Sequence, residues 1–482
     1  MKKIIIYTML SALVLSSGCK KYLDQAPDQR TKLNTPGKVS ELLVTAYPKA
    51  NLFLLSEAMS DNPIDNSTAG GVNQMNIGGY FWKDPESISQ DSPTYYWGSC
   101  YEAIAAANQA LEACNNAANP QEYNSQRGEA LVARAYAHFM LVSYYAKAYN
   151  PATSGTDPGI PYVTAPEKVV LQQYDRKTVA YVYEQIEKDL KEGLPLIKDN
   201  YAVPAYHFTK KAAQAFAARF YLNKRDYKSV IDAANLAFPS NNFAGNVRPW
   251  ISYANLDITE QQKQFTSATN PGNLLLGETI TNMVPSAYYG SRYSFSQVKL
   301  NSVTAPVGVD FTALKKYSTS STFYFVNKFY RHFVYSSINA TTGLNYSMVP
   351  FLTTEELLMN RAEAYVMNED YASALADMNA LISQRVLNYQ EAANGLTNAK
   401  IMAFYVSKTT DVKEAYLNAV LDIKRAEFVH EGIRWMDIKR LNLPVTHNDQ
   451  DGTIRTLAAN DPRRLLQLPA EVTLSGIQLN PR

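Results

Sequence analysis

Few side chains in this sequence are spaced for enzymatic chemistry. Its five histidines show no H-x-x-x-H or comparable spacing, which argues against a zinc site. No G-x-S-x-G motif surrounds a serine, and there is no glycine-rich phosphate-binding loop. Ser296 and Lys299 fit S-x-x-K by letter, but Lys408-Thr409-Thr410 is not the K-T-G motif that accompanies such a serine nucleophile. The sequence therefore predicts no enzyme, no cofactor and no metal site.

The acidic groups favour structural roles. Asp449-Gln450-Asp451-Gly452 is similar to part of a calcium loop, but His447 and Ala458 stand at the first and last ligand positions. A tight turn is the better interpretation. Glu355 and Glu356 begin a predicted helix, where carboxylates suit the helix dipole. Neither set requires a catalytic role.

Cys19 is the residue with the clearest chemical role. Lys2 and Lys3 precede the apolar run 4–15, and small residues lead from it to the cysteine, as in a secretory signal. The run is shorter than the roughly 20 residues that a spanning helix needs. We therefore expect residues 1–18 to be a signal peptide, Cys19 to carry acyl chains, and residues 19–36 to form a membrane tether. An ordinary signal peptide with an unmodified cysteine is the alternative.

The other two cysteines, Cys100 and Cys114, lie fourteen residues apart within one predicted helix. Their Cα atoms would be about 21 Å apart at 1.5 Å per residue. A disulfide requires Cα atoms within about 7 Å. The two are therefore predicted to be buried free thiols.

The charge balance narrows the class of partner. Removing residues 1–18 takes two lysines from the 46 basic residues, which leaves 44 against 44 acidic ones. A neutral chain argues against nucleic acid or an anionic membrane surface as the main partner. The 34 tyrosines are about twice the usual share, and charged residues make up only 19%. This composition suggests a surface that contacts something uncharged.

Most of the chain reads as paired helices. Apolar and small residues recur at helical spacing, and acid-Tyr turns separate neighbouring helices at Asp226-Tyr227 and Asp370-Tyr371. The predicted helices cover residues 38–53, 94–118, 122–149, 179–194, 209–222, 226–237, 354–367 and 371–386. Small residues followed by a tyrosine in the second helix of each pair are typical of divergent tetratricopeptide-type repeats. Such arrays bind other proteins or serve as scaffold.

Residues 240–345 interrupt this helical pattern. Between Ser240 and Asp310, eight of 71 residues are charged and eight are aromatic. Residues 323–330 read as a short β-like run. A loop-rich insertion of this length is functional or disordered, and its aromatic content argues against disorder.

The stretch 422–440 carries the densest motif. Its charged residues stand at helical i,i+3 and i,i+4 distances around a glycine, which predicts a salt-bridge network that locks helices together. A ligand site is the less favoured alternative. The residues concerned are Arg425, Glu427, Glu431, Gly432, Arg434 and Asp437.

This motif, R-x-E-x-x-x-E-G-x-R-W-x-D-[IL]-K-R, closely resembles the C-terminal signature of the SusD/RagB family of lipoproteins in Bacteroidota. The resemblance extends in order over essentially the whole chain. Its further pieces are Tyr22-Leu23-Asp24, Trp97…Tyr101…Ile104…Asn108, Gly128-Glu129-Ala130…Arg134-Ala135-Tyr136, Asn379…Arg385 and Leu468-Pro469…Asn480-Pro481. Ser16 and Lys20-Lys21 depart from the family pattern around the lipid cysteine.

The resemblance implies a mainly α, SusD-like fold: divergent tetratricopeptide-type helix pairs plus a loop-rich, aromatic-rich insertion with minor β structure. Residues 37–482 would form one domain. Its parts would be a scaffold at about 37–240 and 350–440, a ligand-facing insertion at about 240–345, and a C-terminal segment at 441–482.

The resemblance also implies a non-catalytic function. Family members bind a nutrient, usually an oligosaccharide, at the outer membrane and form a lid on a SusC-like TonB-dependent transporter. The implied location is the outer membrane, lipid-anchored at Cys19 and exposed at the surface, although the leaflet stays open. The alternatives are a peptide or other non-glycan nutrient, and a structural repeat lipoprotein without a ligand.

Aromatic residues in loops are the candidate ligand contacts, because the C–H faces of sugars stack on aromatic rings. One set is Tyr80, Phe81 and Trp82 in the early loop region. The other is Trp250, Tyr288, Tyr289 and Tyr293, together with Arg292, in the insertion. Any of these rings could instead pack in the core, as we expect for Trp97 and Trp435.

Overall fold

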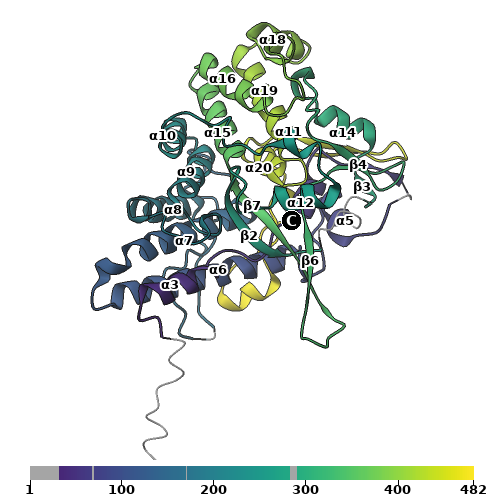
Figure 1. Cartoon of the computed structure of the whole chain (residues 1–482). Helices are drawn as coiled ribbons and strands as arrows, with labels where there is room; N and C mark the ends of the chain where they lie inside the picture. The colour runs from purple at the N-terminus through teal and green to yellow at the C-terminus, as the bar shows by residue number, and fades with distance from the viewer. Residues whose placement is uncertain (1–31, 68–69, 170, 283–289) are drawn as a thin grey trace, which may run out of the picture.

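The computed structural model describes residues 32–67, 70–169, 171–282 and 290–482. The predicted signal peptide, Cys19 and most of the tether therefore lie outside the described residues, as do Tyr288 and Tyr289. The described chain is mainly helical with small antiparallel sheets, as predicted (Figure 1). None of its helices is long and apolar enough to span a membrane.

Seven of the described helices match predicted ranges to within a few residues, whereas the short helices at 74–80, within 250–303 and within 391–405 were not predicted. The first part of the chain contains α3 (Pro36–Leu43), α4 (Phe53–Met59), α5 (Gln74–Tyr80), α6 (Pro93–Asn116), α7 (Asn124–Tyr145), α8 (Val179–Gly193), α9 (Lys210–Lys224) and α10 (Tyr227–Ala237). The second part contains α11 (Trp250–Tyr253), α12 (Ile258–Phe265), α14 (Gln297–Val303), α15 (Thr354–Met367), α16 (Tyr371–Ile382), α17 (Glu391–Asn394), α18 (Asn398–Tyr405), α19 (Val412–Glu427) and α20 (Ile433–Arg440). The predicted helix 38–53 is wrong in extent, because α3 ends at Leu43 and α4 begins at Phe53.

The two acid-Tyr turns have the same geometry. Arg225, the C-cap of α9, and Glu369, two residues after the end of α15, both adopt positive φ. The aspartate that follows each of them caps the next helix, with Asp226 accepting from the Ser229 amide and Asp370 from the Ser373 amide. The same type of turn therefore reverses the chain at both places. It packs α9 against α10 and α15 against α16.

Small buried residues let the helices pack closely. Ala130, Ala133 and Ala137 on α7 are wholly buried, and α7 packs against both α6 and α8. Figure 1 shows α7, α8, α9 and α10 side by side, with α15 continuing the layer toward α16. Cys100 and Cys114 are buried free thiols within α6, which confirms the prediction.

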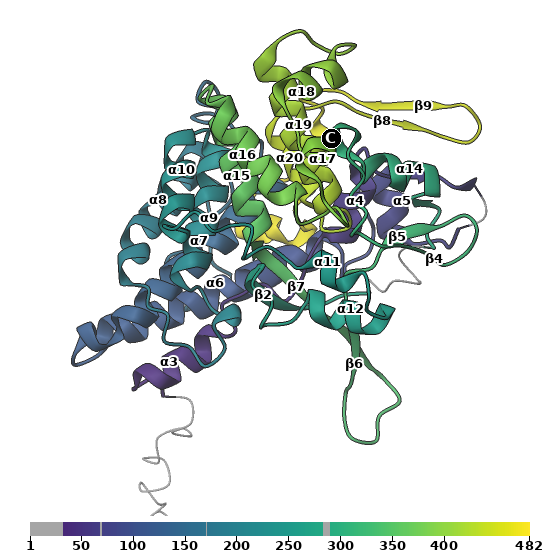
Figure 2. The same ribbon diagram turned by 45° about the horizontal axis from the view of Figure 1, so that its top comes forward.

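The insertion contains the largest sheet. It is antiparallel with the order β2–β7–β6, formed by β2 (Asn273–Ile280), β7 (Gly343–Thr353) and β6 (Arg331–Tyr335). Two-stranded pairs join β1 (Ile64–Asp65) to β3 (Tyr293–Ser294), β4 (Lys316–Ser318) to β5 (Tyr324–Val326), and β8 (Val445–Asn448) to β9 (Ile454–Leu457). The β6–β7 and β8–β9 hairpins project from the body (Figure 2). Only residues 324–326 of the predicted run 323–330 are strand.

The C-terminal motif forms a buried salt-bridge network, but its partners differ from the prediction. Asp61, after α4, bonds the Arg434 guanidinium at 2.8 and 2.9 Å and lies 3.5 Å from that of Arg425. Glu427 pairs with Arg385, and Glu431 accepts from Lys328 at 2.6 Å.

Only Asp437 of the predicted set pairs within its own helix, with Arg440 three residues on. Asp437 also accepts from Lys424 on α19 at 2.9 Å. The predicted i,i+3 and i,i+4 pairs across Gly432 do not form, because α19 ends at Glu427 and Gly432 adopts a φ of +72° before α20 begins. The residues on either side of that turn do not share one helical face. The motif instead ties α19 and α20 to distant elements.

Candidate functional site

Three segments that are far apart in sequence meet on one side of the fold. The β1–β3 ladder pairs Asp65 with Tyr293. Helix α5 is capped by Asn73, and its Asn76 side chain exchanges two hydrogen bonds with the Tyr293 backbone, at 2.6 and 3.1 Å. His447 on β8 faces the carbonyl oxygens of Tyr80 and Ser60, at 2.8 and 2.7 Å. These contacts fix α5, β3 and the β8–β9 hairpin against one another.

Four rings form a continuous stack within this junction. The order is Trp82, His447, Tyr80 and Tyr293, with centroid separations of 4.5, 4.2 and 3.9 Å and interplanar angles of 16° or less. Phe81 stands edge-on to Tyr80 and Tyr293, at 5.3 and 5.4 Å. Four stacked rings form a rigid support, because each ring restricts the rotamers of its neighbours.

Arginine side chains cover the rings that end the cluster. Arg292 lies 5.2 Å from the Tyr293 ring and donates two hydrogen bonds to Asp65, at 2.6 and 2.7 Å. Arg455 lies 4.6 Å from the Phe81 ring and bonds Asp449 at 2.7 Å. Both arginines therefore combine a cation–π contact with a carboxylate that fixes the guanidinium.

Asp65 organises the polar side of the site. Its side chain is 1% exposed, whereas that of Arg292 is 39% exposed. Asp65 also accepts from the Ser67 and Gln450 amides, and the Gln450 side chain donates to its carbonyl oxygen. The Arg292 guanidinium holds the pKa of Asp65 below its usual value. A buried carboxylate thus orients an arginine that reaches solvent.

The Tyr80 hydroxyl and the Asp449 carboxylate lie close to each other inside the site. Burial, together with the charge of Asp449, raises the pKa of Tyr80, so that hydroxyl stays protonated. Burial also lowers the pKa of His447, although the two facing carbonyl oxygens favour its charged form.

The structure brings five of the predicted ligand residues together: Tyr80, Phe81, Trp82, Arg292 and Tyr293. They were predicted as parts of two separate sets. The Gly71 amide donates to the Gly290 carbonyl oxygen at 2.8 Å, which joins the early loop to the insertion. Tyr288 and Tyr289 come just before Gly290 in the chain but lie outside the described residues.

Trp250 does not belong to this site. Its side chain is wholly buried and packs against Tyr253 and Phe265. The expectation that it contacts a ligand is therefore corrected: Trp250 is a core residue. Trp97 and Trp435 are also buried, as predicted.

The stacked rings are not an open platform either. Tyr80 and Trp82 are 0% and 5% exposed, and the Trp82 indole donates to the Met59 carbonyl oxygen at 3.0 Å. Phe81 is the partly exposed ring of the cluster. Tyr293 is also only 5% exposed. We therefore correct the role expected of Tyr80, Trp82 and Tyr293 from contacting a ligand to supporting Phe81 and Arg292.

Sequence reasoning missed the polar half of the site. Asp65, Asp449, Gln450, Arg455 and His447 all contribute to it. Asp449 was correctly predicted to lie in a turn, since its carbonyl oxygen accepts from the Gly452 amide at 3.0 Å. No spacing signal could place that turn beside Tyr80, because 367 positions separate His447 from Tyr80.

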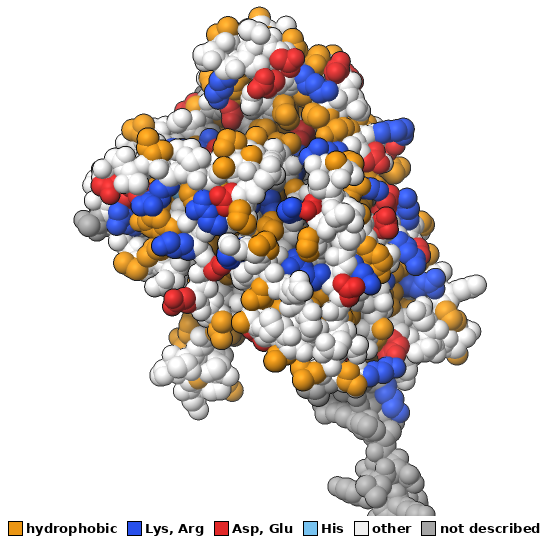
Figure 3. All heavy atoms as spheres, turned by 180° about the vertical axis from the view of Figure 1, so that it is seen from behind, with side chains coloured by type: hydrophobic (Ala, Val, Ile, Leu, Met, Phe, Trp, Pro, Cys, Tyr) orange, Lys and Arg blue, Asp and Glu red, His pale blue; other side chains and the backbone are white. Residues whose placement is uncertain are grey.

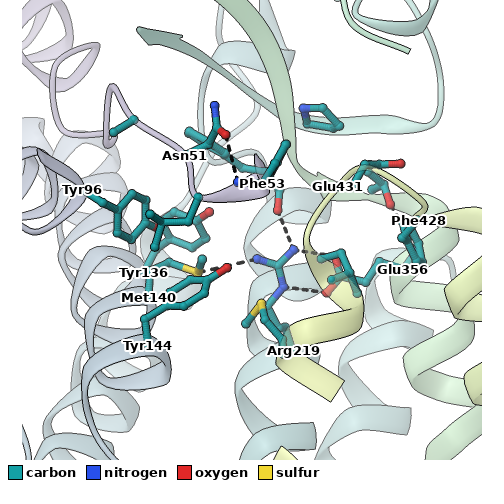
Figure 4. A pocket seen from close by; sticks show the side chains of 17 residues that line it. Asn51, Phe53, Tyr96, Tyr136, Met140, Tyr144, Arg219, Glu356, Phe428 and Glu431 are labelled. Atoms are coloured by element: carbon teal, nitrogen blue, oxygen red, sulfur yellow. Dashed lines mark hydrogen bonds and ion pairs between the residues drawn. The ribbon is translucent and has the colours of Figure 1, made fainter. Parts of the chain in front are cut away.

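Two cavities elsewhere suit an oligosaccharide less well. Figure 4 shows one around the buried Arg219–Glu356 pair, whose volume of about 30 Å³ admits only one or two waters. A groove of about 340 Å³ is lined by Trp97, Tyr101 and Tyr174, but the two tyrosine hydroxyls already donate to Pro161 and Glu167. Within the described ranges, no three His, Cys, Asp or Glu side chains gather as a metal site requires.

Comparison with protein families gives two matches. Residues 21–222 match a family described as starch-binding and associating with the outer membrane, and residues 255–464 match the SusD family. Together they cover most of the chain. The comparison with curated proteins gives no match.

Solved structures share the fold. A SusD superfamily protein of Bacteroides thetaiotaomicron is 19% identical, with a TM-score of 0.69 over 93% of this chain and 100% of that one. A putative sugar-binding protein of Bacteroides vulgatus is 20% identical, with a TM-score of 0.67 over 94% and 99%. A laminarin-binding SusD-like protein is 17% identical, with a TM-score of 0.63 over 93% and 99%.

Proposed function

Because the chain belongs to the SusD family, we propose that it is a non-catalytic lipoprotein that binds an oligosaccharide at the outer membrane. It delivers this ligand to a SusC-like TonB-dependent transporter. Cys19 carries the lipid anchor, and residues 20–36 let the folded domain move over the transporter. The leaflet that holds the anchor is the surface leaflet in this proposal.

The junction of α5, β3 and the β8–β9 hairpin is the observation that supports this function. It offers a partly exposed aromatic ring beside polar groups that point to solvent, which is the combination that sugars require. Phe81 contacts the C–H face of a sugar ring, and Arg292 and Gln450 bond its hydroxyls. Tyr288 and Tyr289, just before Gly290, supply the further aromatic contacts.

Asp65 acts as a positioning residue. Its two bonds to Arg292 fix the plane of the guanidinium before a ligand arrives, which reduces the entropy lost on binding. The stack from Trp82 to Tyr293 serves the same purpose for Phe81. The site is therefore preorganised on its protein side, while its affinity stays modest because few side chains contact the sugar.

Titration calorimetry of the mature protein tests the proposal. We expect saturable binding from a panel of starch, laminarin and other oligosaccharides. Arg292→Ala should weaken that binding by about tenfold or more, since a hydrogen bond from a charged group contributes about 1.5–3 kcal/mol. Phe81→Ala should weaken it similarly. Lys228→Ala, which removes a mostly exposed lysine on α10, is the control and should leave binding unchanged.

The other outcomes identify the alternatives. Binding of peptides but not glycans would make this a peptide-binding member of the same transporter complex. Co-purification of a TonB-dependent transporter without any ligand would favour a structural lipoprotein. Release of sugars from any glycan would contradict the non-catalytic proposal.

A further inference from the structure

The β6–β7 hairpin exposes an unusual amount of apolar surface. Ile338 at its tip is fully exposed, and Tyr335 is 61% exposed. Three further large hydrophobic residues are between 42% and 45% exposed, namely Phe333, Val334 and Leu344. Contiguous exposed apolar surface on a soluble domain marks an interaction site.

The hairpin has a regular register despite this exposure. Its register runs from Arg331 opposite Ser347 to Tyr335 opposite Gly343. Ser336 donates from its amide and its hydroxyl to the Thr342 carbonyl oxygen, at 2.9 and 3.0 Å, which closes the loop. The ring centroids of Phe333 and Tyr335 lie 5.0 Å apart. The exposed side chains are therefore held on a firm projection.

Apolar side chains occupy both faces of this ribbon. Val334 and Leu344 are directly opposite each other on one face, and Phe333 and Tyr335 alternate with them on the other. Ile338 adds the tip. A protein groove covers one face of a strand pair, whereas a lipid layer surrounds an inserted tip on every side. The all-round distribution favours lipid.

The charges of the hairpin agree with that partner. Arg331 is the one lysine, arginine or acidic residue in 331–345. The loop itself, 336–342, contains only Ser, Ile, Asn, Ala and Thr. Hydroxyl and amide groups suit the hydrated headgroup layer, and aromatic side chains such as Phe333 and Tyr335 are typical of the membrane interface.

The hairpin points toward the end of the molecule where α3, the first helix of the described chain, lies. In Figures 1 and 2, α3 and the free end of the hairpin lie at the same end of the fold. Figure 3 shows the hairpin from behind as a lobe that stands off the body. The thirteen residues from Cys19 to Thr31 span about 45 Å at most, so a lipid at Cys19 keeps this end close to a bilayer.

We propose that the tip of the β6–β7 hairpin, from Tyr335 through Ile338, inserts into the outer leaflet of the membrane as a second, non-covalent contact. The three residue-to-residue steps from Tyr335 to Ile338, at about 3.3 Å each, reach about 10 Å, the depth of shallow interfacial insertion. The anchor makes this contact intramolecular, so a weak hairpin affinity suffices to orient the domain. The proposal uses the lipid anchor only to decide which end of the domain faces the membrane. It does not depend on which ligand the domain binds.

Fluorescence of the full mature chain with Cys19→Ser tests the insertion without the anchor and without a transporter. Ile338→Cys is labelled with an environment-sensitive dye, and Val298→Cys is the matched control. Val298 is 80% exposed on α14, away from the hairpin, while Cys100 and Cys114 are buried and stay unlabelled.

We expect vesicles of phosphatidylcholine, and of phosphatidylethanolamine with phosphatidylglycerol, to shift the emission of the dye at 338 to the blue. The dye at 298 should not respond. Because the hairpin carries a single charge, the two lipid compositions should give similar shifts.

Ile338→Asp should reduce vesicle co-sedimentation by about tenfold or more, whereas Val298→Asp should not change it. Both positions are exposed, so both variants are expected to fold. Equal responses at 338 and 298, or none with either vesicle, would overturn the proposal. So would a response at 338 that requires an added transporter, since the hairpin would then bind protein. None of these results bears on oligosaccharide binding.

Discussion

His138 illustrates how one buried residue links the core to pH. Its side chain is wholly buried, and its ring stacks on that of Tyr162 with the ring centroids 3.8 Å apart. Its Nε2 accepts a hydrogen bond from the Val163 amide at 3.0 Å. Its other ring nitrogen faces the Arg134 carbonyl oxygen at 2.9 Å. These contacts hold the neutral imidazole, and burial lowers the pKa of His138 to about 3.

A depressed folded pKa predicts acid lability. Above pH 6.5, His138 is neutral in both states and contributes its full stability. Between pH 6.5 and about 3 only the unfolded state binds the proton, so the free energy of unfolding falls by about 1.4 kcal/mol per pH unit. Urea unfolding at several pH values measures this slope.

His138→Gln is the comparison for this prediction. The variant is expected to be less stable at pH 7, because it loses the ring contact with Tyr162. Its stability should nevertheless fall less steeply with acid, since one titrating group is gone. If the free energy of unfolding of the variant fell as steeply between pH 6.5 and 4.5 as that of the unchanged protein, His138 would not be the source of the acid lability.

At the scale of elements, Gly432 controls the turn between α19 and α20. Its φ of +72° is disfavoured for any residue with a Cβ, and an added Cβ would lie 3.2 Å from the Cβ of Ser56. Gly452, in the β8–β9 turn, has a φ of +85° but nothing within 4 Å of such a Cβ. Comparing alanine variants at these two glycines therefore separates the cost of backbone strain from the cost of steric crowding.

Gly452→Ala is expected to cost about 1–2 kcal/mol in free energy of unfolding, from the positive φ alone. Gly432→Ala should cost at least about 1 kcal/mol more, because the neighbouring α4 must also move. Urea unfolding of both variants gives the difference. Equal losses would mean that α4 yields to the methyl group without strain.

The same elements show what sequence can predict. Helices α6 to α10 and α15 to α16 follow local signals, namely capping residues and small residues at helical spacing, and their bounds differ little from those predicted. The acid-Tyr turns were recognisable because the aspartate in each of them caps the helix that follows, which is a local interaction. The exposed β6–β7 hairpin gives no such local signal, because its Val, Phe and Tyr residues read equally well as a buried strand.

The candidate site was predictable only in part, for a related reason. Arg292 and the aromatic residues at 80–82 were found by residue type and loop context. Their burial and their partners depend on contacts such as His447 with Tyr80 that no local pattern encodes. Trp82 and Trp250 look alike in sequence, yet one supports the site and the other fills the core.

At the scale of the whole molecule, buried ion pairs join its first part to its second. Arg219 on α9 bonds Glu356 on α15 and the Phe351 carbonyl oxygen, in both cases at 2.6 Å. The side chains of the pair are 4% and 7% exposed (Figure 4). The motif residues Arg425 and Arg434 likewise reach Asp61 near the beginning of the fold.

A second cluster buries its charges completely. Arg248, Glu355, Arg385 and Glu427 are connected by ion pairs, and their side chains are at most 1% exposed. Burial alone would raise the pKa of Glu427, but the positive charges of Arg385, Lys328 and Arg248 together hold that pKa below its usual value. Such pairs are costly to break one partner at a time, because the remaining charge stays buried.

This connectivity predicts that residues 37–482 unfold as one unit. Glu356→Gln leaves Arg219 buried without its counter-charge and should cost about 3–5 kcal/mol. Hydrogen exchange should then speed up together in α7 and α19, which lie in different parts of the chain. Glu187→Gln is the matched control, since its pairs with Lys191 and Lys224 lie near the surface and should contribute about 1 kcal/mol or less.

Independent exchange of the two helices would contradict a single folding unit. If α19 alone responded to Glu356→Gln, the helical pairs α6 to α10 would be a module that folds without the second half. Joint acceleration instead implies that the candidate site, built from residues near 65, 293 and 450, exists only when the whole chain is folded. The site depends on the whole fold because its residues, and the residues that support them, come from segments far apart in the sequence. These long-range contacts are the ones that could not be predicted from the sequence.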